Sequence, residues 1–421
     1  MRHAFIKLGH LHIASRLLVM ALVINCAPAH AQANRNDDSP TWSYLVGTDF
    51  WRLHASQQKD TLPGYVEENS NLLLPNSYTK WNYSDASAWG RVVATQRLTN
   101  DITVSAKVRA DQTLGMRVDE AQIEKYISPS LGVRAGVVDY KTSWCRAYEA
   151  DNGWIQEIEA VCNTPQFRDV TGGAPGVQIF TNLTWDDHYR LQSQIGLYRP
   201  LFLNYAPKEF GNIIPSPNYQ VQKNEKLGVN FNLINLYTGL EARLSYIHAN
   251  QIAYLPESKI LGTDKMLSDL LYLGLNAPII TEETNVRITH LQQHQKATCR
   301  SETADLGTCN FNSNFQKKST AVEFSYRWEN LHLFSIGLNR TNFDIQEIYF
   351  TPHLDVYQQS NPNYRKTTQA SFSWRKDWQN KLFTVVQFIK SEHQSSATTK
   401  TGSLPYQAQG NALGVRLGYS Y

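Results

Sequence analysis

Apolar and polar residues alternate one by one along much of the chain. In segment 102–110, for example, Ile102, Val104 and Val108 alternate with Thr103 and Lys107. A period of two places successive side chains on opposite faces of a β-strand. Segments of this kind are about ten residues long, the length that a tilted strand needs to cross a membrane. The pattern therefore predicts strands, and their length is typical of membrane strands.

Sixteen strands are predicted in this way, at 42–55, 86–98, 102–113, 117–127, 131–141, 176–186, 188–199, 226–235, 238–249, 268–277, 283–294, 319–328, 332–343, 367–378, 381–393 and 412–421.

The connections between these strands alternate in length. Short connections rich in Asn, Asp and Pro, which favour tight turns, lie at 99–101, 128–130, 186–187, 234–237, 277–282, 329–331 and 379–380. Long connections lie at 56–85, 142–175, 200–225, 250–267, 295–318, 344–366 and 394–411, and one short connection, at 113–116, interrupts their series. Short turns on one rim and long loops on the other are typical of an outer-membrane barrel. We therefore expect an all-β protein, a transmembrane antiparallel β-barrel of about sixteen strands with short periplasmic turns and long extracellular loops.

Residues 1–31 predict a cleaved secretory signal peptide, which would leave a mature barrel of residues 32–421. A basic flank precedes the apolar run 17–24, and Ala-His-Ala at 29–31 fits the small-x-small cleavage rule. The apolar run is shorter than the roughly 20 residues that a membrane-spanning helix needs. Cys26 raises the alternative of a lipoprotein, but the Asn before it fits a lipidation site poorly.

The mature chain would retain four cysteines, and an even number in an exported protein suggests disulfides. The simplest of the three possible pairings joins Cys145 to Cys162 and Cys299 to Cys309, each within one long loop. A zinc site is the competing interpretation. The spacings of 17 and 10 residues do not match the close pairs of zinc sites, so we expect no bound metal.

Composition narrows the class further. The chain has 421 residues and a formal charge of +3, of which the first 31 residues supply three basic and no acidic side chains. The remainder is neutral, which argues against a nucleic-acid partner. A mean hydropathy of −0.43 excludes a bundle of membrane helices but not a barrel. The 22 Tyr and 10 Trp suit strands and membrane interfaces.

The last strand gives the sequence a family resemblance. Leu413, Val415, Leu417, Tyr419 and Tyr421 alternate with other residues up to the chain end, and this ending resembles the Gram-negative outer-membrane porins. The hairpin at 120–138 is also similar to a porin hairpin. The resemblance implies that Tyr419 and Tyr421 form the signal read by the barrel-assembly machinery. It also implies a water-filled channel for small hydrophilic solutes, surrounded by outer-membrane lipid, with a homotrimer as one possible state.

Charged positions assign the two faces of the predicted strands, because charge on the lipid face is costly. The acidic candidates for the lumen are fewer than the basic ones, with Glu241 and Glu323 the firmest. A basic excess predicts a weak preference for anions, unless the arginines pair with loop carboxylates or lie at the rims. The basic pore-lining candidates are Arg91, Arg97, Lys107, Arg109, Arg134, Arg190, Arg243, Arg287, Arg327, Arg375 and Arg416.

Segment 142–175 is the third long-side connection, and the resemblance implies that it folds into the barrel and narrows it. The acidic candidates of this constriction loop are Glu149, Asp151, Glu157 and Glu159. Facing the basic wall, they would create a transverse field. The alternative is a loop that caps the barrel from outside.

Other functions find less support. His393-Gln-Ser-Ser396 resembles the His-x-Ser stretch of the outer-membrane phospholipase over four residues only, and the expected Asn-Gly is missing. His290 and His294 lack the Glu of zinc hydrolases, so we expect neither an enzyme nor a cofactor. An energised transporter would need a plug domain before the barrel, but the strand pattern already begins at Trp42. A fatty-acid-type transporter would need an N-terminal hatch, and the short, polar segment 32–40 fits a hatch poorly. A substrate-specific uptake channel and an adhesin remain open, as do the solute and the oligomeric state.

Overall fold

The protein is described here by a computed structural model. The residues that it describes are 40–57, 82–111, 115–138, 144, 153–156, 174–199, 220–254, 263–279, 283–300, 311–350, 356–359, 363–399 and 402–421. The predicted signal peptide, residues 1–31, lies outside these residues.

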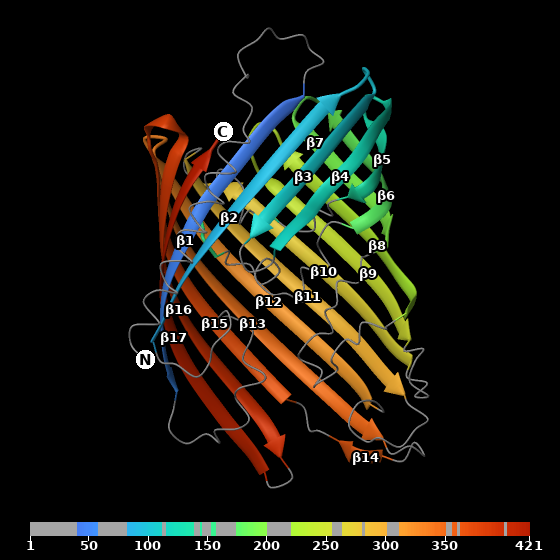
Figure 1. The fold of residues 1–421 in the computed structure, drawn as a ribbon, viewed down its shortest axis with the longest axis vertical. Helices are drawn as coiled ribbons and strands as arrows, with labels where there is room; N and C mark the ends of the chain where they lie inside the picture. The colour runs from blue at the N-terminus through green and yellow to red at the C-terminus, as the bar shows by residue number, and fades with distance from the viewer. Residues whose placement is uncertain are drawn as a thin grey trace, which may run out of the picture.

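Seventeen strands make up almost all of the described chain (Figure 1), and the only helical element among them is the short 3₁₀ turn η1 (Gln379–Lys381). The strands are β1 (Thr41–Gln57), β2 (Asn82–Arg97), β3 (Ile102–Asp111), β4 (Gly115–Ser128), β5 (Leu131–Val138), β6 (Ala174–Trp185), β7 (Tyr189–Tyr198), β8 (Gln220–Asn235), β9 (Glu241–Tyr254), β10 (Thr263–Pro278), β11 (Thr284–Arg300), β12 (Phe311–Trp328), β13 (His332–Phe350), β14 (Val356–Gln359), β15 (Asn363–Asp377), β16 (Leu382–Thr399) and β17 (Gly402–Ser420).

The strands close into a single antiparallel barrel. Leaving β14 aside, each strand pairs with its neighbours along the chain, and β1 pairs with both β2 and β17, so no edge of the sheet stays open. Two backbone hydrogen bonds between Tyr44 and Tyr421 fasten the seam, and their rings stack with centroids 5.0 Å apart. Sixteen strands form the wall, while the four-residue β14 pairs only with the end of β13. Closure gives every wall strand a hydrogen-bonded neighbour on both sides, which a bilayer demands of a sheet that spans it.

All sixteen predicted strands are confirmed, whereas several of the long loops were predicted too long. Segment 394–411, for example, was expected to be a loop, but β16 runs to Thr399 and β17 starts at Gly402. The reason is chemical, because the end of β16 is Gln, Ser, Ala and Thr without an apolar face, and the start of β17 contains Gly402 and Pro405, which are rare in strands. A strand without an apolar face leaves no period-two signal in the hydrophobic pattern.

Tight turns join the strands at one end of the barrel, here called the turn rim; the opposite end is the loop rim. The described residues of the turn rim are 98–101, 129–130, 186–188, 236–240, 279, 283, 329–331 and 378–381. Asp186 and Asp187 both have positive φ, as do Glu329 and Asn330. Two successive residues with positive φ are typical of the hairpin turns that match the twist of antiparallel strands.

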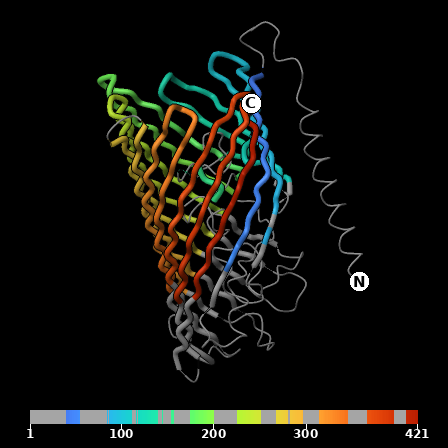
Figure 2. Tube along the Cα trace, turned by 90° about the vertical axis from the view of Figure 1, so that its left-hand side faces the viewer, coloured from blue at the N-terminus to red at the C-terminus, as the bar shows by residue number. Residues whose placement is uncertain are grey.

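The barrel wall differs in height around its circumference. Strands β3 to β7 contain 8 to 14 residues, whereas β11, β12, β13, β16 and β17 contain 17 to 19. Figure 1 shows the short strands ending well before the orange and red ones, and Figure 2 shows the long strands continuing toward the end opposite the C-terminus.

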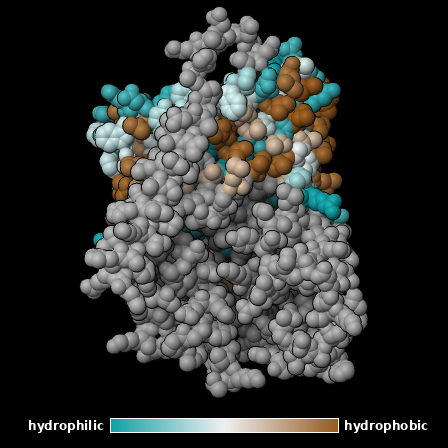
Figure 3. All heavy atoms as spheres, viewed as in Figure 1, coloured by the Kyte–Doolittle hydropathy of each residue, from teal (hydrophilic) through white to brown (hydrophobic). Residues whose placement is uncertain are grey.

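The outer surface of the barrel is apolar near the turn rim. Large side chains such as Leu273, Phe324 and Leu338 are exposed there, and Figure 3 shows apolar side chains gathered at this end of the visible face. Aromatic side chains lie at the rim itself: Trp185 stacks on Tyr189, and Trp328 lies beside His332. An apolar band bordered by aromatic residues is the surface that a membrane barrel presents to lipid. No helix in the described part of the chain is long and apolar enough to span a bilayer.

Candidate functional site

Alternation separates the side chains of each strand into a buried and an exposed set. On β10, Ser268, Leu270 and Tyr272 are buried, whereas Leu271 and Leu273 are exposed. The buried set faces the lumen, because residues of segment 142–175 contact it on strands all around the barrel. The described residues of this segment are Trp144 and 153–156.

Trp144 lies against the wall formed by β9, β10 and β11. Its indole N–H donates a hydrogen bond to Glu241 Oε1 at 3.0 Å, and its ring packs edge-on against Tyr272. Gly274 provides the room for this packing, since a Cβ at that position would overlap the indole ring. Glu241 is the first residue of β9, so Trp144 reaches close to the turn rim.

Residues 153–156, here called the strap, bind the opposite wall. The Gln387 side chain on β16 accepts hydrogen bonds from the backbone N–H groups of Ile155 and Gln156, at 3.0 and 2.8 Å, and donates one to the carbonyl of Gln156 at 2.8 Å. The Ser373 hydroxyl donates to the carbonyl of Gly153. Gln387 is fully buried, so these bonds form away from water, where they are stronger.

The strap also packs by apolar contact. Ile155 belongs to a buried cluster with Leu45, Trp89, Phe383 and Val385, which come from β1, β2 and β16. Contacts with this many strands are possible only from inside the closed barrel.

Three wall carboxylates each bind one indole N–H and one arginine. Asp49 binds Trp89 and, through both of its oxygens, Arg416 at 2.7 and 2.8 Å. Glu241 joins Trp144 to Arg243 at 3.1 Å.

The third carboxylate, Glu323, accepts a hydrogen bond from the Trp154 indole at 3.0 Å and forms an ion pair with Arg287 at 3.2 Å. Two of these three indoles belong to segment 142–175, so the same carboxylates neutralise wall arginines and hold the inserted segment.

Most of the predicted pore-lining arginines pair with carboxylates of the wall itself. Arg109 pairs with Asp119, and Arg134 with Glu124. Arg375 and Arg327 share Asp377 near the turn rim. Arg243, Arg287 and Arg416 are paired as described above. The partners of these arginines are therefore carboxylates of the wall strands, whereas the sequence had suggested carboxylates of the long loops.

The remaining basic candidates have other surroundings. Arg91 is buried on β2, directly across from Arg109 on β3, while Lys107 and Arg190 are half-buried. Arg97 lies at the turn rim, where its guanidinium donates to the carbonyls of Thr99 and Asn100.

Two further lysines, Lys226 and Lys317, lie on the lumenal face of β8 and β12 and are buried; neither was among the pore-lining candidates predicted from the sequence.

Several predicted site residues lie outside the described part of the chain. These are Glu149, Asp151, Glu157 and Glu159 of the constriction loop and the cysteines Cys145, Cys162 and Cys309, together with the side chain of Cys299. Tyr419 and Tyr421 lie at the seam between β17 and β1.

Sequence reasoning missed Asp49, Trp89 and Gln387. Asp49 carried a usable signal, because a carboxylate next to apolar residues near the middle of a membrane strand is costly on the lipid face and is therefore expected to face the lumen. Gln387 carried none, since its role depends on a segment more than 200 residues away.

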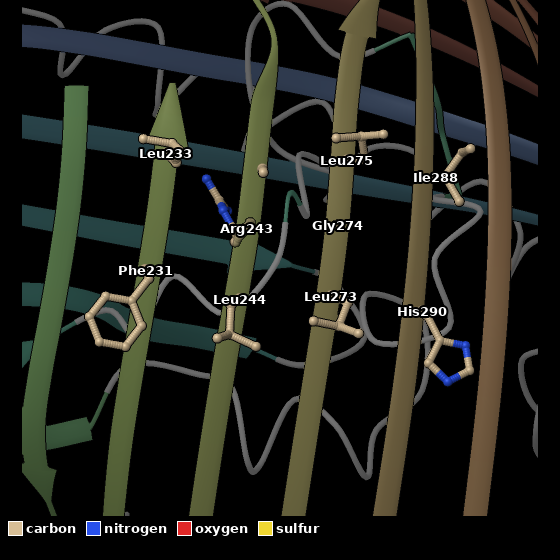
Figure 4. Close-up of a pocket in the computed structure, with 10 residues that line it drawn as sticks. Phe231, Leu233, Arg243, Leu244, Leu273, Gly274, Leu275, Ile288 and His290 are labelled. Atoms are coloured by element: carbon tan, nitrogen blue, oxygen red, sulfur yellow. The ribbon is translucent and has the colours of Figure 1, made fainter. Parts of the chain in front are cut away.

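A shallow groove on the outer face crosses β8 to β11 and is distinct from the lumen (Figure 4). Phe231, Leu244, Leu273 and Ile288 line it, with His290 at one end. Its lining is mostly apolar and outward-facing, so it is part of the surface that lipid would cover.

The comparisons agree with this architecture. No family model and no curated protein matches the chain. Among solved structures, it is similar to the outer membrane channel DcaP of Acinetobacter baumannii, with 10% identity and a TM-score of 0.51 over 92% of this chain and 99% of that one. The anion-selective porin from Comamonas acidovorans has 11% identity and a TM-score of 0.50 over 91% and 100%. OmpT, an outer membrane protein of Vibrio cholerae, has 8% identity and a TM-score of 0.50 over 92% and 99%. The chain therefore has the fold of the outer-membrane porins and channels.

Proposed function

We propose that the protein is an outer-membrane porin of a Gram-negative bacterium, a water-filled diffusion channel for small hydrophilic solutes that segment 142–175 narrows. The turn rim would face the periplasm and the loop rim the exterior. The observation that carries the proposal is the binding of Trp144 and the strap inside a closed wall of sixteen strands. A barrel of this strand number is wide enough for an aqueous lumen, and a segment fixed within it limits the size of what passes.

The charge of the described lumenal face supports a weak preference for anions. Twelve basic residues lie on that face: Arg91, Lys107, Arg109, Arg134, Arg190, Lys226, Arg243, Arg287, Lys317, Arg327, Arg375 and Arg416. Seven acidic residues lie on it: Asp49, Asp119, Glu120, Glu124, Glu241, Glu323 and Asp377. The excess among described residues is 12 − 7 = 5 positive charges. Because most arginines are paired, the field along the lumen is weaker than the arginine count suggests, so the preference is weak. The name of the similar porin from Comamonas acidovorans states the same selectivity.

Planar-bilayer recording tests the proposal. Purified mature protein should insert as stable conductance steps, with a reversal potential on the anion side in a salt gradient. A bilayer that stays tight at high protein load would contradict a channel function. It would favour instead one of the alternatives, such as an outer-membrane enzyme or adhesin.

Two further features belong to the proposed maturation. Cleavage after residue 31 would start the mature chain at Gln32, which N-terminal sequencing of the outer-membrane fraction would detect. The pairings Cys145–Cys162 and Cys299–Cys309 would stiffen segment 142–175 and one further loop. Non-reducing peptide mapping that joins Cys145 to Cys299 would refute them.

A homotrimer stays a prediction, for which the mass of the detergent-solubilised protein is the measurement.

A further inference from the structure

The outer face of β12, β13 and β15 changes from apolar to basic at one level of the barrel. Toward the turn rim, these strands expose Phe324, Ile336, Leu338 and Phe372. Toward the loop rim, the outward-facing positions of the same strands are basic: Lys318 on β12, Arg340 on β13 and Lys366 on β15. Lys318 and Arg340 are exposed, and Lys366 is half-buried.

The strand register brings these three basic residues together. Lys318 lies directly across from Asn342, which lies directly across from Lys366. Arg340 precedes Asn342 by two residues on the same strand and points to the same side. Neighbouring strands are about 4.8 Å apart, so the three long side chains surround one point on the surface. Lys318, Arg340 and Lys366 are here called the basic triad.

The triad is not neutralised within the described part of the barrel. The described residues form no ion pair with any of its three members, although Lys390 on the adjacent β16 pairs with Glu392 at 3.7 Å. The acidic residue nearest in register is Asp344, two residues beyond Asn342. Three positive charges and one negative charge leave a basic surface.

The apolar band below the triad is short for a membrane wall. On β13 it runs from His332 to Leu338, and six residue steps of about 3.3 Å at a tilt of about 45° rise only about 14 Å. Membrane barrels usually present a band about 25 Å tall. Arg340 follows Leu338 by two residues, so the triad lies at the edge of this short band, where long side chains reach the lipid headgroups, and its charges need an anionic partner there.

We propose that the basic triad binds the phosphate group of a lipid in the outer leaflet. Arg340 is suited to two parallel hydrogen bonds with phosphate oxygens, and Lys318 and Lys366 supply flanking point charges. The acyl chains of the same lipid would lie over Leu338, Ile336 and Phe372. The proposal concerns the lipid-facing wall and does not depend on what the lumen conducts.

Native mass spectrometry of the detergent-solubilised full-length barrel tests this. Dioleoyl phosphatidic acid, the probe, should bind with an affinity at least tenfold higher than that of dioleoyl phosphatidylcholine. In the triple variant Lys318→Gln/Arg340→Gln/Lys366→Gln, the affinity for phosphatidic acid should fall at least tenfold. The matched control Arg52→Gln/Lys296→Gln/Lys390→Gln removes three exposed basic residues from β1, β11 and β16 and should change it less than twofold.

Equal losses in the two triple variants would overturn the proposal, since they would indicate general attraction to positive charge. Displacement of the lipid by millimolar inorganic phosphate would also overturn it, because the site would then serve soluble phosphate. Heat-modifiable gel mobility shows whether each variant is folded. If the triple variant does not fold, Lys318→Gln/Lys366→Gln must still lower the affinity at least threefold for the proposal to stand.

Discussion

The two faces of the barrel wall treat positive charge in opposite ways. On the lumenal face, Arg416 is only 3% exposed and is held by both oxygens of Asp49. On the outer face, Lys318 and Arg340 are exposed and form no ion pair among the described residues. Inside, a buried charge must be paired and hydrogen-bonded, because the alternative is a large desolvation cost. Outside, water and lipid headgroups can supply the partner.

This difference changes how the sequence should be interpreted. A count of lumenal arginines overstates the positive charge of the pore, because the arginines that are most buried are the ones that carboxylates neutralise. The lumenal ion pairs therefore support structure and position the inserted segment, and under our proposal the smaller excess of basic residues sets selectivity. Each of the following experiments tests one side of this contrast.

The largest effect should come from breaking a lumenal pair. Asp49→Ala leaves Arg416 buried without its carboxylate, which costs about 3–5 kcal/mol in comparable cases. Because Trp89 also loses its acceptor, we expect the free energy of unfolding, measured by urea titration in detergent, to fall by at least that amount.

The matched control for this experiment is an outward-facing pair. Glu392→Ala removes the acid from the exposed pair with Lys390, and pairs of this kind are worth about 0.2–1 kcal/mol. Similar losses in the two variants would show that burial does not distinguish the two faces.

The next effect concerns the strap. Gln387→Leu keeps the side-chain size but removes three hydrogen bonds to Ile155 and Gln156. Each bond contributes about 0.5–1.5 kcal/mol, and the abandoned backbone groups would be buried. We expect the strap to leave the wall, so that single-channel conductance in 1 M salt rises by about half or more and open-channel noise increases.

Gln369→Leu is the control for the strap experiment. Gln369 is also lumenal and buried, but the bond recorded for it is to Ser371 on its own strand. This variant should keep the wild-type conductance. Wild-type conductance in Gln387→Leu would mean that the strap does not limit the pore.

A smaller effect is expected on ion selectivity. Arg109→Gln/Arg134→Gln leaves Asp119 and Glu124 without their partners, so the lumen gains two uncompensated negative charges. The reversal potential should shift toward cations by several millivolts at 0.1 M salt and hardly at 1 M. Over this range the Debye length falls from about 10 Å to about 3 Å.

The same charge change on the outer face is the control for selectivity. Lys318→Gln/Lys366→Gln should leave the reversal potential unchanged, because lipid and the wall separate these residues from the ion path. A shift of equal size in this variant would mean that the two faces are not electrically separate.

Much of the fold could be predicted from the sequence because strand alternation is a local signal. Turn chemistry is equally local, and Asp186-Asp187 and Glu329-Asn330 adopt the positive φ values that such turns need. The loop-rim ends of β16 and β17 could not be predicted, since Gln, Ser and Thr at the end of β16 hide the alternation, and Gly402 and Pro405 at the start of β17 disfavour a strand.

The candidate site was only partly predictable, because its partners come from distant strands. Glu241 and Glu323 were recognised as lumenal acids, but their bonds to Trp144 and Trp154 join residues 97 and 169 positions apart. A residue's face follows from alternation within one strand. Its partner follows from closure of the whole barrel, which no local pattern contains.

The smallest effect concerns an acid exposed at the turn rim. The Thr99 hydroxyl donates a hydrogen bond to the Asp101 carboxylate at 2.6 Å, and this bond holds the pKa of Asp101 below its usual value. A group whose pKa is lowered by folding contributes stability above its unfolded pKa and loses it as the pH falls through the folded value. Because Asp101 is open to water, that contribution is small.

Thr99→Ala should therefore raise the pKa of Asp101 toward its ordinary value, whereas Thr99→Ser, which keeps the hydroxyl, should not. NMR titration of the carboxyl carbon in detergent micelles measures both. The unfolding free energies of wild type and Thr99→Ala should differ most at neutral pH and converge below the folded pKa, where Asp101 is protonated in both. A pKa unchanged by Thr99→Ala would mean that solvent, and not the hydroxyl, stabilises this charge. The turn rim would then resemble the outer face, where no fixed protein partner is needed, more than the lumen.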